Sequence, residues 1–136
     1  MRFFLYGTLL QGACNGVATA LHRGLEPGRA AVARGALHAI PDPAGWYPAL
    51  LPDPAGAPVH GMVHETGPAF TPADLAALDA WEGTDYARAE IPVEDGGLFF
   101  MAHAWLWTAP LPPGALAIPE GDFRAFAAAH GLAEFR

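Results

Sequence analysis

The stretch 71–88, Thr-Pro-Ala-Asp-Leu-Ala-Ala-Leu-Asp-Ala-Trp-Glu-Gly-Thr-Asp-Tyr-Ala-Arg, contains the strongest helix signals of the chain and then the start of a strand. Thr71 is a good N-cap, and Pro72 occupies the first helical position. Asp74, three positions after Thr71, completes a Thr-x-x-Asp capping pattern. Gly83 is placed to end the helix. The pattern predicts a helix over 72–81 that is followed directly by a strand.

Outside this stretch, short apolar segments alternate with glycine and proline turns. The Asp95-Gly96-Gly97 segment is a strong hairpin signal between two such segments. Pro92 lies inside the first of the two, which predicts an edge strand or a bulge there. The predicted strands are Phe3 to Tyr6, Arg29 to His38, Trp46 to Leu51, Val59 to Glu65, Tyr86 to Val93 and Leu98 to Trp107.

Two further helices are short. One is predicted from Asn15 to His22, before Gly24, and one from Phe123 to Ala129, capped by Asp122. Many short strands with few helices predict an α+β fold, a small mixed, largely antiparallel β-barrel with short flanking helices. A length of 136 residues suits one domain over 1–136.

The charge composition excludes several kinds of chemistry. The net charge is −7, and all seven basic residues are arginine, as a GC-rich bacterial genome would favour. Without lysine, Schiff-base catalysis, a Walker-type phosphate lysine and a lysine general base are excluded. An acidic chain without a basic patch is also a poor nucleic-acid binder, so no nucleic-acid partner is expected.

The compartment is inferred from what the sequence lacks. No apolar run approaches the roughly 20 residues that span a bilayer, and the first residues do not resemble a signal peptide. Cys14 is the only cysteine, which rules out an intrachain disulfide and a thiolate zinc cluster. We therefore expect a cytoplasmic protein without a membrane partner, in which Cys14 is a small buried apolar residue.

Glu82 is the first candidate for chemistry. It lies at the predicted C-terminal end of a helix, where the partial negative charge of the helix disfavours a carboxylate. Trp81 and Tyr86 are near enough in sequence to exclude water from it. Both effects raise the pKa of a carboxyl group, as proton transfer near neutral pH requires. The alternative is a solvated glutamate at a helix end.

The second candidate is the loop Tyr6-Gly7-Thr8-Leu9, directly after the first predicted strand. A glycine there allows a sharp turn in which successive backbone N–H groups point at one anion. Such a loop can hold a carboxylate without a lysine. The alternative is an ordinary turn between a strand and a loop.

Together these motifs resemble those of a known family. The Tyr-Gly-Thr-Leu start, Gly45-Trp46-Tyr47-Pro48, Gly61 before an apolar strand, and Leu78-Asp79-x-x-Glu82-Gly83-x-x-Tyr86-x-Arg88 occur in the order found in γ-glutamylcyclotransferase-like (AIG2-like) proteins. The resemblance covers roughly residues 2 to 108. The chain lacks the Tyr-Gly-Ser-Leu-x-Trp form of the glutathione-specific branch, which argues against glutathione as substrate.

The resemblance implies a barrel with a central cavity, acid/base catalysis by Glu82, and substrate binding by Tyr6, Gly7, Thr8, Leu9 and Tyr86. The implied reaction cyclises a γ-glutamyl amine or γ-glutamyl amino acid to 5-oxoproline and a free amine. No metal or cofactor is implied, because the attacking amine belongs to the substrate. The expected partner is that small molecule, and we expect a monomer or weak homodimer.

Other candidate residues have simpler interpretations. His60 and His64 fall in one predicted strand, roughly 13 Å apart, too far to share a zinc ion, and are expected to be half-exposed. Arg88 is expected to be solvated or paired with Asp85. Tyr47 is more typical of a core aromatic. A glycosidase-like pair of Glu82 with Asp85 or Asp79 is conceivable.

Two alternative functions share the same site. One is a non-catalytic module that holds a small carboxylate metabolite in the barrel cavity. The other is a hydrolase that uses water, which would release free glutamate.

Overall fold

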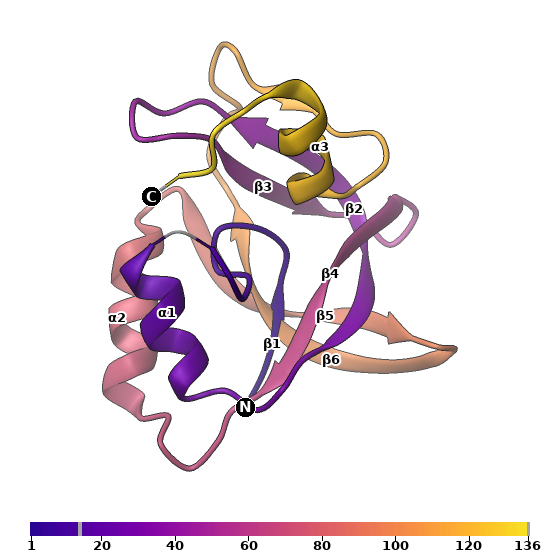
Figure 1. Ribbon diagram of the computed structural model, residues 1–136. Coiled ribbons are helices and arrows are strands. Elements are labelled where there is room, and N and C mark those ends of the chain that lie inside the picture. Colours follow the sequence, from indigo (N-terminus) through magenta and orange to yellow (C-terminus); the bar gives the residue numbers. More distant parts are fainter. Residues whose placement is uncertain (14, 136) are drawn as a thin grey trace.

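The computed structural model describes residues 1–13 and 15–135, and the expectation for Cys14 therefore lies outside the described residues. Seven strands and three helices follow one another within this part (Figure 1). In chain order they are β1 (Arg2–Leu5), α1 (Gly16–Arg23), β2 (Arg29–Ile40), β3 (Tyr47–Pro52), β4 (Ala57–Glu65), α2 (Pro72–Glu82), β5 (Tyr86–Asp95), β6 (Leu98–Trp107), β7 (Leu116–Ala117) and α3 (Phe123–His130).

Five of the strands close into a barrel. Their order is β2-β4-β1-β6-β5, and β5 returns to β2 at the pair Val32 and Glu94. The pairing of β1 with β6 is parallel, at Phe3 and His103, whereas the other barrel pairings are antiparallel. Strands β3 and β7 both pair with β2 outside this ring. The fold is thus a five-strand mixed barrel with extra strands and three helices, which confirms the predicted fold class.

The β5–β6 hairpin forms where the glycine pair predicts it. Gly96 and Gly97 adopt φ angles of 55° and 88°, a left-handed conformation that side chains disfavour. Pairing runs without interruption from Tyr86 to Asp95, so no bulge occurs at Pro92. On its other side β5 meets β2 only at Glu94, which leaves Pro92 on a free edge.

Alternation along β1 divides the core into two layers. Phe4 faces the barrel interior, while Phe3 and Leu5 face outward under helices α1 and α2. These two helices lie side by side against the β1 side of the barrel, and α3 lies near the opposite end (Figure 1). Phe123 and Ala127 of α3 join the interior cluster.

The helix ends are the ones that the cap residues predict. Thr71 accepts the Asp74 backbone N–H and the Asp74 side chain accepts the Thr71 N–H, a complete capping box. Asn15 and Asp122 cap α1 and α3. Within the described residues, no helix is both long and apolar enough to cross a membrane.

Candidate active site

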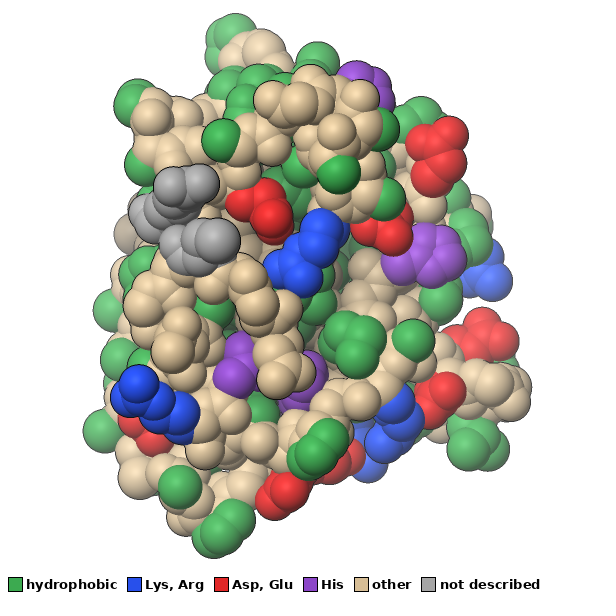
Figure 2. Space-filling model, in the orientation of Figure 1, with side chains coloured by type: hydrophobic (Ala, Val, Ile, Leu, Met, Phe, Trp, Pro, Cys, Tyr) green, Lys and Arg blue, Asp and Glu red, His purple; other side chains and the backbone are tan. Residues whose placement is uncertain are grey.

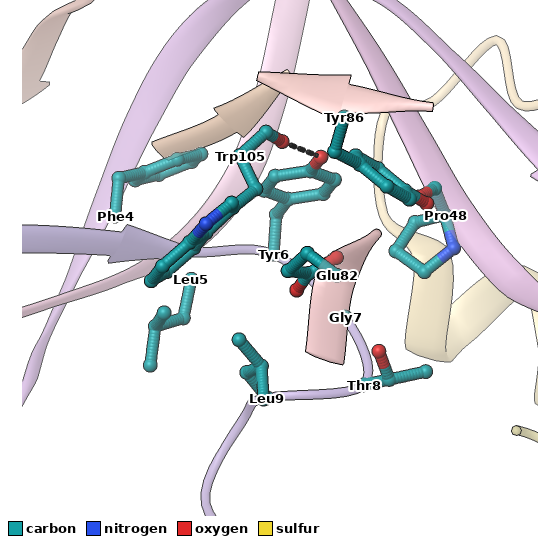
Figure 3. A pocket seen from close by; sticks show the side chains of 10 residues that line it. All are labelled: Phe4, Leu5, Tyr6, Gly7, Thr8, Leu9, Pro48, Glu82, Tyr86 and Trp105. Atoms are coloured by element: carbon teal, nitrogen blue, oxygen red, sulfur yellow. Dashed lines mark hydrogen bonds between the residues drawn. The ribbon is translucent and has the colours of Figure 1, made fainter. Parts of the chain in front are cut away.

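A pocket opens where β1 runs into the loop that follows it (Figure 3). It encloses about 300 Å³ of empty space, part of it open to solvent. Every predicted site residue lines it, together with four residues that were not predicted. The lining residues are Phe4, Leu5, Tyr6, Gly7, Thr8, Leu9, Pro48, Glu82, Tyr86 and Trp105.

The loop is shaped by a turn and by a close contact. The Leu10 N–H donates to the Gly7 carbonyl at 2.9 Å, which places Thr8 and Leu9 at the centre of a tight turn. A Cβ atom on residue 7 would lie 2.1 Å from Cγ of Pro48. Only glycine therefore allows β3 and the loop to form adjacent walls of the pocket.

Two tyrosine hydroxyls fix the walls to each other. Tyr6 donates to the Trp105 carbonyl, and Tyr86 donates to the Pro48 carbonyl at 2.5 Å. Burial, followed by neighbouring negative charge, raises the pKa of both hydroxyls far above the ordinary value. Both tyrosines therefore stay protonated and act as donors to the backbone, so neither can serve as the base.

Glu82 is the last residue of α2, and its side chain points into the pocket between Tyr6, Tyr86 and the loop (Figure 3). Burial first, and then the negative charge of Asp79, together raise its pKa from 4.5 to about 8. Within the described part of the chain, no hydrogen bond or ion pair engages its carboxyl group. A carboxyl group of this kind can accept and release a proton near neutral pH.

Asp79 lies one turn earlier on α2 and has the opposite environment. It accepts hydrogen bonds from Nε and Nη2 of Arg88, at 3.0 and 3.3 Å, and from Nε1 of Trp105 at 2.9 Å. These donors, Arg88 first, lower the pKa of Asp79. The expected pairing of Arg88 with Asp85 is therefore wrong: Asp85 precedes β5, and the Arg88 guanidinium is paired with Asp79 instead.

Two aromatic side chains lie away from the carboxyl group. Trp81 was expected to exclude water from Glu82, but its ring packs edge-on against Phe135, with centroids 6.0 Å apart, and does not line the pocket. Tyr47 packs against Trp107 and Phe135, as a core aromatic would. Of the two aromatic residues expected beside Glu82, only Tyr86 lines the pocket with it.

The two histidines of β4 differ from each other. His60 is exposed, as a surface residue would be, but His64 is only 2% exposed, so the expectation that both are half-exposed is wrong for His64. Nδ1 of His64 donates to the Glu26 carbonyl, and its ring packs edge-on against His22. Among the described residues, no three His, Cys, Asp or Glu side chains are grouped as metal ligands.

The lining residues that sequence reasoning missed come from the barrel itself. Trp105 lies on β6, and Phe4 and Leu5 lie on β1 beside the loop. Trp105 reaches the pocket through the pairing of β6 with β1, which are far apart in the chain, and no local pattern reveals this. Pro48 had a signal, because it ends the Gly45-Trp46-Tyr47-Pro48 motif.

The surface beyond the pocket shows no concentration of one charge on the face seen in Figure 2, where arginine and acidic side chains are scattered among apolar and polar groups. Arg2 pairs with Glu65 at 2.5 Å and Arg29 with Asp95 at 2.6 Å. Both arginines also lie over the ring of Phe100. Much of the positive charge is thus paired locally.

Comparison with known structures supports the same fold. An AIG2-like protein from Mus musculus is 21% identical, with 99% of this chain and 94% of that chain covered and a TM-score of 0.73. An uncharacterized protein from Pyrococcus horikoshii is 17% identical, with 96% of each chain covered and a TM-score of 0.66. A domain-sized part of YkqA from Bacillus subtilis is 19% identical over 96% of this chain and 42% of that one, with a TM-score of 0.70.

Sequence comparison then gives the family. No curated protein sequence matches the chain significantly. The family described as gamma-glutamyl cyclotransferase, AIG2-like, matches residues 3–125, which include the loop, Glu82 and the five barrel strands apart from Arg2. The chain belongs to the gamma-glutamyl cyclotransferase, AIG2-like family.

Proposed function

We propose that this protein is a γ-glutamyl cyclotransferase that converts a γ-glutamyl amine or γ-glutamyl amino acid to 5-oxoproline and a free amine. The observation that carries the proposal is the position of Glu82, whose carboxyl group has a pKa of about 8, faces the Tyr6–Leu9 loop and has no partner among the described residues. Family membership supports the reaction class.

The reaction needs one proton carrier. The ionised Glu82 takes a proton from the α-ammonium group of the substrate, and the freed amine attacks the γ-carbonyl carbon to form a new N–C bond. Glu82 then gives this proton to the amide nitrogen as the C–N bond to the leaving amine breaks. The ring nitrogen still carries one surplus proton, which Glu82 takes up and passes to the released amine, so that the amine departs as an ammonium ion. No water is consumed, and Glu82 returns to its ionised form.

Positioning contributes a large part of the rate. A γ-glutamyl chain must fold back so that its own nitrogen lies near its carbonyl carbon, and holding it there removes much of the entropic barrier. The backbone N–H groups of Thr8 and Leu9 are suited to the substrate α-carboxylate. The hydroxyl groups of Tyr6 and Tyr86 keep the surrounding walls in place.

The leaving amine would lie toward the open side of the pocket. The empty space of about 300 Å³ between the lining residues includes open solvent, so the enclosed part is small and leaves no room for a large amine. The proposal therefore places the glutamyl part within the pocket and the amine at its solvent-exposed mouth.

The test is to incubate the protein with a panel of γ-glutamyl amines and amino acids and to assay both 5-oxoproline and free glutamate. The proposal predicts 5-oxoproline from at least one compound and a loss of about 10²- to 10⁴-fold in kcat for Glu82→Gln. Free glutamate as the main product would indicate hydrolysis instead. No turnover across the panel, with ligand binding unaffected by Glu82→Gln, would favour a binding module.

A further inference from the structure

The loop that faces Glu82 is held from behind by side chains that lie outside the pocket. Nδ2 of Asn15 donates to the Thr8 carbonyl at 2.7 Å, and Nε2 of His22 lies 2.7 Å from the Leu9 carbonyl. Asn15 precedes α1 and His22 lies in its last turn, so one short helix carries both contacts. Neither residue lines the pocket.

These contacts fix the direction of the loop N–H groups. In a trans peptide the C=O and the N–H of the same unit point in opposite directions, and the described chain contains no cis peptide. The Thr8 carbonyl and the Leu9 N–H belong to one peptide unit. When Asn15 holds that carbonyl toward α1, the Leu9 N–H must point away from α1.

The neighbouring peptide units are fixed in the same way. The Gly7 carbonyl accepts the Leu10 N–H, so the Thr8 N–H, which shares a peptide unit with that carbonyl, is directed away from the turn interior. Among the described residues, the N–H groups of Thr8 and Leu9 have no hydrogen-bond partner. Two adjacent donors without a partner, beside a pocket that both residues line, are suited to an anion.

From this geometry we infer that Asn15 is a positioning residue for the substrate α-carboxylate, which it serves by aiming the Leu9 N–H into the pocket. The inference rests on the proposed function for its substrate. His22 supports the same orientation at the next carbonyl. Burial lowers the pKa of His22, the hydrogen bond to the Leu9 carbonyl opposes this, and His64 adds to the lowering. Because the Leu9 carbonyl can only accept, His22 carries a proton on Nε2 and donates it to this carbonyl.

Asn15 also caps α1, and an experiment must distinguish this structural role from its contact with the loop. Its Oδ1 accepts the Ala18 N–H at 2.7 Å and so caps α1. Serine and aspartate cap a helix about as well as asparagine, but neither carries the amide donor that reaches Thr8. Asn15→Ser and Asn15→Asp therefore keep the cap and remove the contact with the loop, whereas Asn15→Ala removes both.

The experiment compares two substrates in these variants. The first is the best γ-glutamyl compound of the panel, and the second is its 4-aminobutanoyl counterpart, which keeps the amine and the carbonyl but lacks the α-carboxylate. For Asn15→Ser we expect KM for the first substrate to rise about five- to tenfold with kcat nearly unchanged, because binding is lost equally in the ground and transition states. Asn15→Asp should raise KM for the first substrate further, because the aspartate adds a negative charge behind the loop.

The second substrate provides the control. Its kinetics should be the same in wild type and Asn15→Ser, and the melting temperatures of these two proteins should agree, while Asn15→Ala melts lower. An unchanged KM in both cap-preserving variants would overturn the inference. So would an equal rise for the two substrates, which would indicate a merely structural role.

A binding measurement distinguishes failure of this inference from failure of the proposed function. If wild type turns over no γ-glutamyl compound, the proposed reaction fails, and L-glutamate and L-5-oxoproline are then titrated against labelled protein. The inference requires the Leu9 amide resonance to shift on titration in wild type and much less in Asn15→Ser. Absence of that shift in wild type, or an equal shift in both proteins, would contradict it.

Discussion

The two sides of the last turn of α2 place carboxyl groups in opposite environments. Asp79 faces β5 and β6, where three donor N–H groups of Arg88 and Trp105 lower its pKa. Glu82 faces the pocket, where no described residue offers it a donor and its pKa rises to about 8. Helix position and charge type are nearly the same for both. The difference arises from what the barrel places in front of each carboxyl group.

The comparison shows how one ionised carboxyl group can raise the pKa of another. Because Asp79 is held ionised by its donors, its charge remains beside Glu82 and opposes ionisation there. The following predictions test this contrast, from the largest expected effect to the smallest.

A shift of the Tyr6–Leu9 loop should have the largest effect on the difference in environment between Asp79 and Glu82. In Gly7→Ala the new methyl group would overlap Pro48, so the loop or β3 must shift and admit water to Glu82. We expect a loss of about 2–3 kcal/mol in the free energy of unfolding, measured by urea denaturation, and loss of most activity. Gly16→Ala is the control, because a Cβ atom there meets nothing within 4 Å. Equal stability of the two variants would contradict the packing argument.

Removing the Glu82 charge should stabilise the protein at high pH. The pKa is about 8 in the folded protein and ordinarily 4.5, so stability is complete below about 4.5 and falls as the pH rises toward 8. Glu82→Gln does not titrate and avoids this loss.

Its advantage over wild type should therefore grow by at most about 1.4 kcal/mol per pH unit between pH 5 and 8 and level off above. Thermal unfolding across this range measures it. Glu120→Gln, at an exposed glutamate, controls for the change in net charge. An advantage that shrinks with rising pH would have the wrong sign and would refute the assignment.

Removing the Asp79 charge should bring the pKa of Glu82 closer to that of an ordinary carboxyl group. In Asp79→Asn the negative charge beside Glu82 is lost and Arg88 is left without its partner, so the pKa of Glu82 should fall. The rising limb of kcat/KM against pH should then move to lower pH, with a stability loss of about 1 kcal/mol. Asp85→Asn, which removes the acid adjacent in sequence, should leave that limb in place. A limb that moves in Asp85→Asn alone would show that the wrong acid has been identified.

The smallest effect is expected from Tyr86→Phe. This change removes one hydroxyl group and leaves the Pro48 carbonyl without its donor, while the ring continues to shield Glu82. KM should rise a few-fold, with a stability change of about 1 kcal/mol. A loss of kcat as large as that of Glu82→Gln would instead assign the hydroxyl group a direct part in proton transfer.

The sequence predicted those features that depend on neighbouring residues. The helix caps at Thr71 and Asp122 and the turn at Gly96-Gly97 are local signals, and the structure confirms them. The pairing of the loop with Glu82 in one pocket was predicted from motifs rather than from distance. It could be found because each motif is short and continuous.

Features that depend on the barrel could not be predicted. Arg88 reaches Asp79 because β5 runs beside the end of α2, and the Trp105 indole reaches the same carboxylate from β6, 26 residues away in the chain. The burial of His64 depends on Gly28, where a Cβ atom would lie 2.4 Å from the imidazole ring. Asn15 could be recognised from sequence as a helix cap, but its second hydrogen bond runs to a loop whose position only the fold determines.

The position of β1 has a consequence for how the barrel is made during synthesis. This strand lies between β4 and β6, which pair with it through residues 62–65 and residue 103. Because the chain is synthesised from its N-terminus, Phe3, Phe4 and Leu5 leave the ribosome long before residue 103 does. Until then this apolar strand has a free edge and is open to pairing with other chains. The nascent protein is therefore most vulnerable to aggregation through the same segment that ends as its most buried strand.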